Sequence, residues 1–362
     1  MNKASMMLAF VVGAAVGLGA CDDADTSDEG VPPATDAGRD AGRDAGHDAG
    51  AAPVLDAAVD AAVDAGGARQ SVTLRFKGKV GSQDLACGQN YPGQGTKSST
   101  ITPRDFRFFV HNVRLISATG SEVPMHILER PPYQTQEVTL IDFADGTGSC
   151  DPSDKGTNLE ITGTVPVGNY TGVAFVEGVP EQLNHADPAL HPGPLQASGV
   201  SWGWTLGYRF VMAEVVASTS GDAAVADAGG HAGAPIAPPP DAGVDAGGAH
   251  GGDAGSGHGG VSGGLGFVHL GSTGCAGTQG SGDAGPGVSC DKPNRPEVRL
   301  TNFNPVTNSI VADLGAVFSK ADLTGSVQCH GSGPACAPMF EALGVNLDTG
   351  AALPTQQVFR VE

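Results

Sequence analysis

Two stretches of low complexity determine how much of this 362-residue chain can fold. Residues 22–68 consist almost throughout of Ala, Asp, Gly and Val, in units such as "DAGRDAGRDAGHDAG", and similar units return at about 218–264. Such segments bury too little apolar surface to offset the entropy of the chain, so we expect both to be disordered. Folding is then confined to two blocks, about 69–217 and about 265–362.

The same two stretches hold most of the formal charge of −20. Residues 22–68 carry 12 acidic and 2 basic side chains, and residues 220–264 carry 5 acidic and no basic ones, which leaves about −5 for the remainder. The acidity therefore belongs mainly to the low-complexity segments. No basic surface of the kind that grips nucleic acid is left, so we expect no nucleic-acid partner.

Both blocks show the pattern of short strands between Gly and Pro turns. "SVTLRFKGKV" alternates apolar and polar residues, and "DFRFFVHNVRLI" is rich in β-branched and aromatic side chains. A short helix is expected only from about Ala312 to Phe318. The chain is thus predicted to be all-β, a β-sandwich with long loops over residues 69–362.

The insert at about 218–264 interrupts this predicted sandwich. A strand that runs to Ala217 and resumes at "GLGFVHLG" indicates a hairpin whose tip has been extended. Long insertions at such a place cost little free energy, because the entropy of closing a loop grows slowly with its length.

The N-terminus, "MNKASMMLAFVVGAAVGLGACDD", has the proportions of a signal peptide, with a positive start and a short apolar stretch. Its end, "LGAC", resembles a bacterial lipobox, which implies cleavage after residue 20 and lipidation of Cys21. An ordinary secretory signal with an incidental cysteine is the alternative. We expect residues 1–20 to be a lipoprotein signal peptide and residues 21–68 a flexible tether. The protein would then be lipid-anchored in the cell envelope, on the periplasmic face or the outer surface.

Six cysteines remain after Cys21, and an even number in an exported chain suggests three disulfides. Six cysteines allow 15 pairings. Short loops favour Cys275–Cys290 and Cys329–Cys336, which leaves Cys87–Cys150. The chain has no CxxC motif, so a thiolate zinc site or a redox site is not expected.

Histidine and tryptophan offer the main candidates for chemistry. The only two tryptophans, Trp202 and Trp204, lie in "SWGWTLGYRF", and in a strand this spacing would turn both indoles to the same face. Among ten histidines, His185 lies in a loop rich in turn formers and His269 on a strand. Two neutral imidazoles without a matched carboxylate cluster suit copper at least as well as zinc.

The remaining histidines are expected to have other roles. Four lie in the low-complexity segments, where they serve as polar spacers: His47, His231, His250 and His258. His111 is expected to be a structural strand residue and His126 to lie on a strand surface. His330, beside Cys329 in a predicted turn, is likewise not expected to bind metal. No phosphate loop, Ser nucleophile elbow, paired-His zinc motif or general acid–base pair is present, so we do not expect an enzyme.

Seven strings occur in an order that resembles the MbnP family of copper-binding proteins: "LACGQNYPGQG", "DFRFFVHNVRLI", "VTLIDFADGTGSC", "GTVPVGNYTGVAFVEGVPEQLNHAD", "SWGWTLGYRF", "HLGSTGC" and "CDKPNRPEVRL". The resemblance covers about 70–217 and 265–362. The family was first named for methanobactin operons and is also called one half of a metallo-mystery pair. Its members are partnered by a dihaem protein related to MauG and bacterial cytochrome c peroxidases.

The resemblance implies a mechanism for the tryptophan pair. The dihaem partner oxidises a tryptophan to kynurenine, whose aniline nitrogen can bind metal where an indole has no free lone pair. The implied copper site, best suited to Cu(I), consists of His185, His269 and Trp202 as kynurenine, with Trp204 as the alternative. Asn184 and Asp187 are the implied residues that orient His185.

The chain departs from the family pattern at two places, and an alternative function is also compatible with its sequence. Relatives often have a Met before the WxW pair, where this chain reads "ASGVSW", and often read Cys-Met where this chain has Cys329-His330. The rival function is a surface β-sandwich module for adhesion or carbohydrate binding, because exposed tryptophan pairs can stack on sugar rings. Chelator-insensitive glycan binding would distinguish that function from copper binding.

Overall fold

The computed structural model describes residues 67–151, 156–203, 205–218, 264–278, 287–331 and 333–362. The predicted signal peptide, the lipidation site Cys21, and all but the edge residues of the tether and insert lie outside these ranges. Trp204 lies outside them as well.

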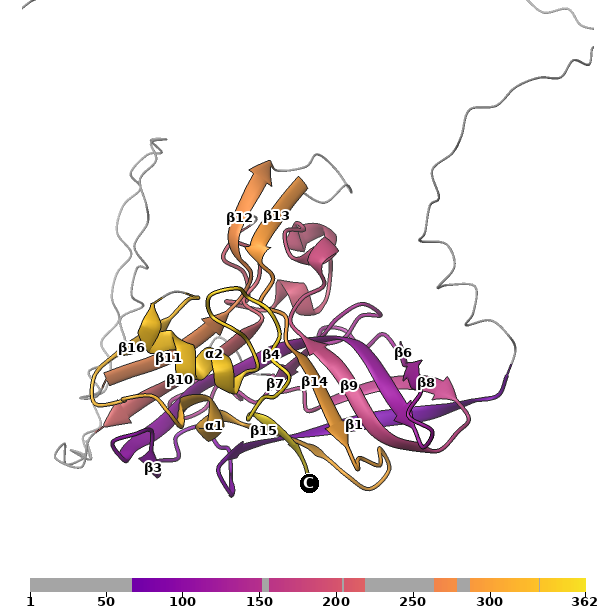
Figure 1. Cartoon of the computed structure of the whole chain (residues 1–362), viewed down its shortest axis with the longest axis horizontal. Helices are drawn as coiled ribbons and strands as arrows, with labels where there is room; N and C mark the ends of the chain where they lie inside the picture. Colours follow the sequence, from indigo (N-terminus) through magenta and orange to yellow (C-terminus); the bar gives the residue numbers. More distant parts are fainter. Residues whose placement is uncertain (1–66, 152–155, 204, 219–263, 279–286, 332) are drawn as a thin grey trace, which may run out of the picture. The chain divides into compact units, whose positions relative to one another are not determined.

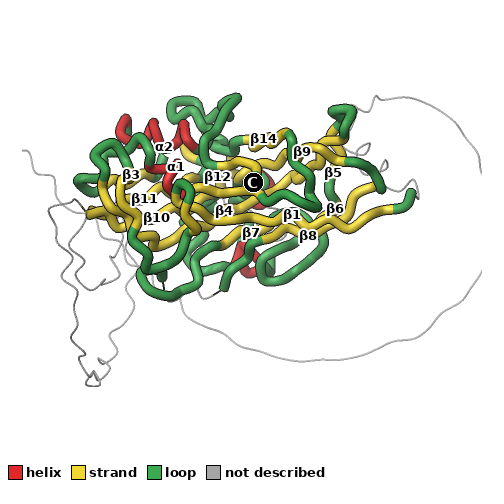
Figure 2. The backbone as a smooth tube through the Cα atoms, turned by 90° about the horizontal axis from the view of Figure 1, so that it is seen from below, coloured by secondary structure: helices red, strands yellow, loops and turns green. Residues whose placement is uncertain are grey.

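Two β-sheets pack face to face and confirm the predicted β-sandwich (Figures 1 and 2). The six-stranded sheet has the order β17 (Phe359–Val361), β15 (Ile310–Asp313), β1 (Arg69–Val80), β8 (Glu160–Pro166) and β6 (His126–Ile127), with β2 (Gln83–Asp84) beside β1. The nine-stranded sheet has the order β14 (Glu297–Thr301), β9 (Tyr170–Glu177), β4 (Ser99–Ser117), β10 (Val211–Ser218), β11 (Gly264–Leu270) and β16 (Val327–Cys329), with β3 (Tyr91–Gln94), β5 (Glu122–Pro124) and β7 (Thr139–Asp142) beside β4. A separate hairpin of β12 (Thr273–Thr278) and β13 (Gly287–Lys292) projects from the sandwich (Figure 1).

Aromatic side chains from both sheets meet in the core. The ring of Phe108, on β4, lies 6.0 Å from Phe76 on β1 and 5.2 Å from Phe359 on β17, and Phe175 on β9 lies 5.4 Å from Phe359. All three pairs are edge-to-face, the arrangement that the ring quadrupoles favour. This aromatic contact joins the two sheets.

The predicted hairpin around the insert is present. Strands β10 and β11 pair in antiparallel fashion from Val211 opposite Leu270 to Ala217 opposite Gly264. The residues that connect them, 219–263, lie outside the described part of the chain.

The helices are short and differ in part from the prediction. Helix α1 spans Leu314–Phe318, and the residues before it, expected to begin the helix, instead complete β15. The reason is a cap: Asp313 accepts a hydrogen bond from the backbone N–H of Ala316 at 3.2 Å, which begins the helix after it. The other helical turns are α2 (Ala337–Ala342), η2 (Glu181–Leu183), η3 (Pro188–Leu190), η4 (Pro194–Gln196) and η5 (Pro334–Cys336). Within the described residues, no helix is both long and apolar enough to span a membrane.

The three disulfides are those predicted. Cys87 is bonded to Cys150, Cys275 to Cys290 and Cys329 to Cys336. The second bond closes the projecting β12–β13 hairpin, and the third ties the end of β16 to the turn η5.

Candidate metal site

Trp202 lies in a closed turn and not in a strand, so the strand geometry considered for the tryptophan pair does not apply to Trp202. The backbone N–H of Trp202 donates to the carbonyl of Gly207, and Gly207 in turn donates to Gly203. Gly203 and Gly207 have φ angles of 95° and 80°, in the left-handed region that interrupts an extended strand. A single bridge between Ser201 and Tyr208 closes this turn.

The turn covers the face of the nine-stranded sheet that points away from the core. Along β10 and β11, alternate residues turn to opposite faces. Val211 is paired with Phe108, whose ring lies in the core, so Met212 and its partner His269 point to the other face. His269 is nevertheless only 6% exposed.

His269 is held in one orientation by a carboxylate. Its Nε2 lies 2.7 Å from Oε1 of Glu214, on the neighbouring strand β10. Burial on its own would raise the pKa of Glu214, but the hydrogen bond with His269 and nearby positive charge hold that pKa below its usual value. An ionised carboxylate only accepts, so Nε2 carries the proton and donates it.

The second nitrogen of His269 is therefore the one that can bind a metal. In the neutral imidazole, Nδ1 bears the lone pair when Nε2 is protonated. Nδ1 is buried and has no hydrogen-bond partner within the described part of the chain. A carboxylate that orients a histidine through one nitrogen while the other faces a metal is the usual arrangement in metal sites.

Trp202 packs beside His269, so the structure brings together two of the three predicted ligands. Their ring centroids lie 6.4 Å apart, and the guanidinium of Arg209 lies 5.5 Å from the centroid of the indole. Gly271 makes this approach possible, because a Cβ at that position would overlap the six-membered ring of Trp202.

His330 joins the same cluster, although its sequence context did not favour a metal-binding role. Its ring centroid lies 5.1 Å from His269, 5.9 Å from Trp202 and 4.7 Å from Phe267. Phe267 also stacks on His269, with centroids 4.6 Å apart. The grouping follows from the pairing of β11 with β16, which brings His269 and His330 close together. About 60 residues separate these two strands in the sequence, so no local pattern indicates that they pair.

A small cavity leads to this cluster from the surface. Its volume is about 280 Å³, and it is lined by Trp202, Leu206, Ser272, Thr273, Gly274, Cys275 and His330. The indole and the imidazole of His330 are thus accessible to a small solute, while His269 lies deeper.

His185 lies on the other side of the Cys275–Cys290 disulfide. Its Nε2 is 3.2 Å from Sγ of Cys290 and 2.9 Å from Nδ2 of Asn184, while Cys275 lines the cavity with Trp202. The side chain of Asn184 thus contacts the imidazole of its sequence neighbour His185. Asp187 caps the turn η3 by accepting from the backbone N–H of Ala189 at 2.9 Å.

The described residues contain two groups of three ligand atoms within 4.8 Å of one another. One consists of His185, Cys275 and Cys290, and the other of Asp145, Cys87 and Cys150. Both include a disulfide, whose sulfurs are not thiolates and so lack the usual metal-binding form of cysteine. Neither group is a ready-made thiolate site.

Two further histidines behave as the sequence suggested. His111 lies 2.8 Å from the carbonyl oxygen of Gly178 through Nδ1, and burial lowers its pKa to about 4, so it is a neutral structural residue. His126 is exposed on β6.

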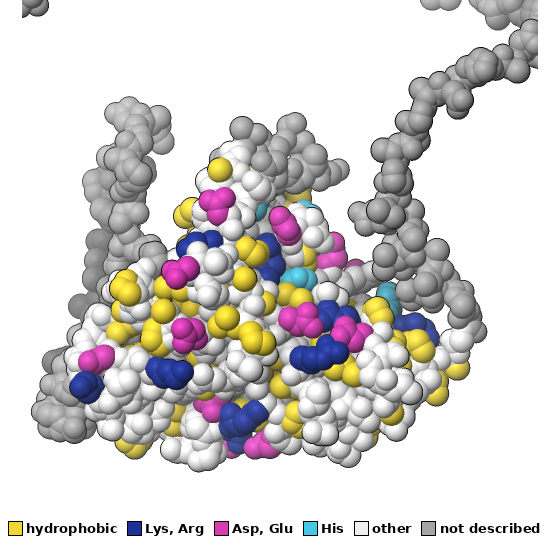
Figure 3. Space-filling model, in the orientation of Figure 1, with side chains coloured by type: hydrophobic (Ala, Val, Ile, Leu, Met, Phe, Trp, Pro, Cys, Tyr) yellow, Lys and Arg dark blue, Asp and Glu magenta, His cyan; other side chains and the backbone are white. Residues whose placement is uncertain are grey.

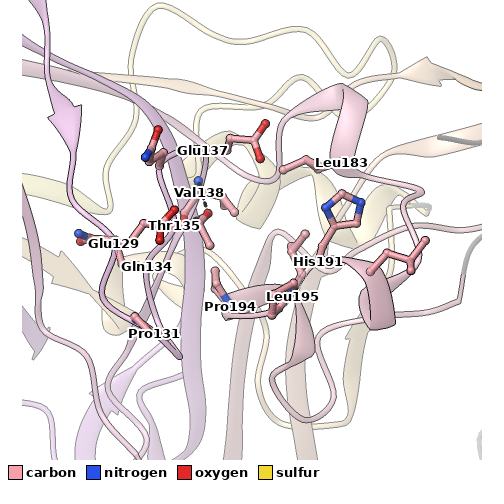
Figure 4. A pocket seen from close by; sticks show the side chains of 13 residues that line it. Glu129, Pro131, Gln134, Thr135, Glu137, Val138, Leu183, His191, Pro194 and Leu195 are labelled. Atoms are coloured by element: carbon pink, nitrogen blue, oxygen red, sulfur yellow. Dashed lines mark hydrogen bonds between the residues drawn. The ribbon is translucent and has the colours of Figure 1, made fainter. Parts of the chain in front are cut away.

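The described residues that line a larger cavity do not include the residues predicted to bind metal. It has a volume of about 690 Å³, and Figure 4 shows His191 facing it with leucine and proline side chains around it. Glu129 and Glu137 contribute carboxylates to its lining, and its described lining residues include neither Lys nor Arg. On the face drawn in Figure 3, acidic and basic side chains are interspersed.

The comparisons with known proteins identify the family of this chain. The family model MbnP matches residues 69–331, which is more than half of the chain. The solved structure of MbnP from Methylosinus trichosporium is similar, with a TM-score of 0.60 and 25% identity over 81% of this chain and 98% of that one. No curated protein matched the chain in a sequence comparison. With its two sheets, its three disulfides and a match over residues 69–331, the chain belongs to the MbnP family, a family implicated in metal handling.

Proposed function

We propose that this protein binds copper in the cell envelope and that it is not itself an enzyme. The observation that carries the proposal is the buried imidazole of His269, whose Nε2 is bonded to Glu214 and whose Nδ1 is left without a partner among the described residues. A neutral imidazole nitrogen is a suitable donor for either oxidation state of copper. Family membership supports a role in metal handling in general.

Trp202 would complete the site after oxidation to kynurenine by a dihaem partner related to MauG. The unmodified indole contributes only an N–H donor. Opening its five-membered ring leaves an aniline nitrogen beside a ketone, close to His269, and the nitrogen donors together suit Cu(I). The cavity beside Trp202 is the opening through which an oxidant or metal would reach it.

His185 is the further imidazole that we propose for this region, with Asn184 and Asp187 around it. It reaches the Trp202 cavity only through the disulfide between Cys275 and Cys290. Trp204 stays the alternative to Trp202 as the oxidised residue.

Mass spectrometry after co-production with the dihaem partner tests the modification. The tryptic peptide 156–209 contains both tryptophans and ends at Arg209. Conversion of one tryptophan adds one oxygen and removes one carbon from its mass. We expect Trp202→Phe to abolish this change together with Cu(I) binding, and the matched Trp204→Phe variant to retain both. The reverse pattern would assign the modification to Trp204, and an unchanged wild-type mass would refute it.

Attachment to the membrane through Cys21 is tested separately. Metabolic labelling with a fatty acid should mark the wild-type protein, and Cys21→Ser should release it into the soluble fraction. Glycan binding that resists chelators and is lost in Trp202→Ala, in a protein that takes up no copper, would support the carbohydrate-binding function instead.

A further inference from the structure

His330 occupies a position that the strand register makes predictable. Strand β16 runs parallel to β11, with Phe267 opposite Gln328 and Val268 opposite Cys329. His330 therefore follows as the neighbour of His269. Side chains at neighbouring positions of paired strands share a face, so both imidazoles point away from the core of the sandwich.

The distance between the two imidazoles suits a shared metal ion. Their centroids lie 5.1 Å apart, with the ring planes at 63°. Two imidazoles on one ion, at metal–nitrogen distances of about 2 Å, have centroids about 5 to 6 Å apart. The separation of the two rings is thus compatible with joint ligation of one ion.

His330 also lies at the boundary between the buried histidine and solvent. It lines the 280 Å³ cavity with Trp202, and its centroid is 5.9 Å from the indole. A disulfide to Cys336 fixes the residue immediately before it. The position is therefore accessible to an incoming ion and yet held in place by a covalent bond.

We propose that His330 is a copper ligand of this chain and forms, with His269, the imidazole pair of the site. This inference rests on the proposed copper function and refines its ligand set. His185, by contrast, directs its Nε2 toward Asn184 and a disulfide sulfur.

The test uses full-length protein co-produced with its dihaem partner and shown by mass to contain kynurenine. Copper affinity is measured by competition with a chromophoric Cu(I) chelator for wild type, His330→Gln, His330→Met and the control His191→Gln. Loss of groups that only orient a ligand already weakens metal binding about 10- to 100-fold, so His330→Gln should lose at least about tenfold. His330→Met should retain more Cu(I) affinity than His330→Gln, because a soft thioether binds Cu(I) whereas an amide binds it poorly, and His191→Gln should match wild type.

A second measurement needs no substitution and so does not depend on whether a variant folds. With nitrogen-15-labelled histidine, addition of Cu(I) should shift the ring nitrogens of both His269 and His330. Unshifted His330 nitrogens, or an unchanged affinity of His330→Gln, would overturn the proposal, and a loss of affinity in His185→Gln alone would assign the second imidazole to His185.

The two proposals fail in different ways. If kynurenine forms and copper binds without His330, the copper function stands and the ligand assignment falls. If tryptophan stays unmodified but copper binding still depends on His330, the assignment stands and the maturation step falls. If wild type binds no copper at all, both are refuted.

Discussion

At the scale of single residues, the candidate site depends on close packing around one indole. Gly271 has no Cβ, and a Cβ built there would overlap the Trp202 ring and lie 2.7 Å from the carbonyl oxygen of Tyr208. Glu214 orients His269 from the neighbouring strand. Neither residue has an unusual sequence context, because their importance comes from neighbours that lie far away in the sequence.

Gly271→Ala should displace Trp202 and reduce its conversion to kynurenine. Overpacking of this kind costs about 1–3 kcal/mol in folding free energy, because the surrounding atoms must move. Tryptophan fluorescence and the mass of peptide 156–209 measure the two effects. The matched control is Gly325→Ala, whose Cβ would have no neighbour within 4 Å. Equal behaviour of the two variants would contradict this account of the packing.

Glu177 makes the stability of the fold depend on pH. It is fully buried on β9, neither carboxylate oxygen has a hydrogen-bond partner among the described residues, and burial raises its pKa well above 4.5. Because the pKa of Glu177 is higher in the folded than in the unfolded state, the fold favours the protonated form of this side chain. The resulting stability is fully present below pH 4.5 and is lost as the pH rises toward the raised pKa. Within this range the loss is about 1.4 kcal/mol per pH unit.

Glu177→Gln should therefore remove this part of the pH dependence. Urea unfolding at pH 4.5 and pH 7.5 measures it, and the variant should gain stability relative to wild type at the higher pH. Glu137→Gln, at an exposed position, is the control and should behave like wild type. A variant with the same slope as wild type would show that Glu177 is ionised in the folded protein.

At the scale of elements, short-range patterns were predictable and tertiary neighbours were not. Alternation and turn residues predicted the strands and the β10–β11 hairpin, and loop length favoured the correct disulfides. The aromatic residues around Trp202 are compatible with a strand, but Gly203 and Gly207 turn the backbone instead. His330 was not selected because nothing local indicates that β16 lies beside β11.

The disulfides should separate stability from metal binding. In the chain-entropy account, the 63-residue separation of Cys87 and Cys150 is worth about 4 kcal/mol, and the 7-residue separation of Cys329 and Cys336 about 2 kcal/mol. Replacing the first pair by serine should therefore lower the urea midpoint more. Replacing the second pair should weaken copper binding more, because β16 precedes His330. Equal losses of copper affinity would contradict a specific role for the Cys329–Cys336 bond.

At the scale of the whole molecule, the sandwich should fold without the insert. Ala217 and Gly264 are paired neighbours on β10 and β11, so a two-residue Asn-Gly turn can replace residues 218–263. Each halving of a loop recovers about 0.6 kcal/mol, and shortening this connection to two residues is between four and five halvings, which predicts a gain of about 3 kcal/mol. Thermal unfolding and copper titration measure the result. A lower copper stoichiometry would assign a metal-binding role to the histidines of the insert.

Composition and spacing determined which parts of the chain fold, that they form strands, and which cysteines pair. These properties follow from local periodicity, turn residues and loop length. The tertiary structure alone decided which imidazoles lie beside Trp202. Glu214, His269 and His330 come from β10, β11 and the end of β16, and the turn that carries Trp202 lies over them. The physical reason is the order of strands in the nine-stranded sheet, because it brings together side chains that no local pattern connects.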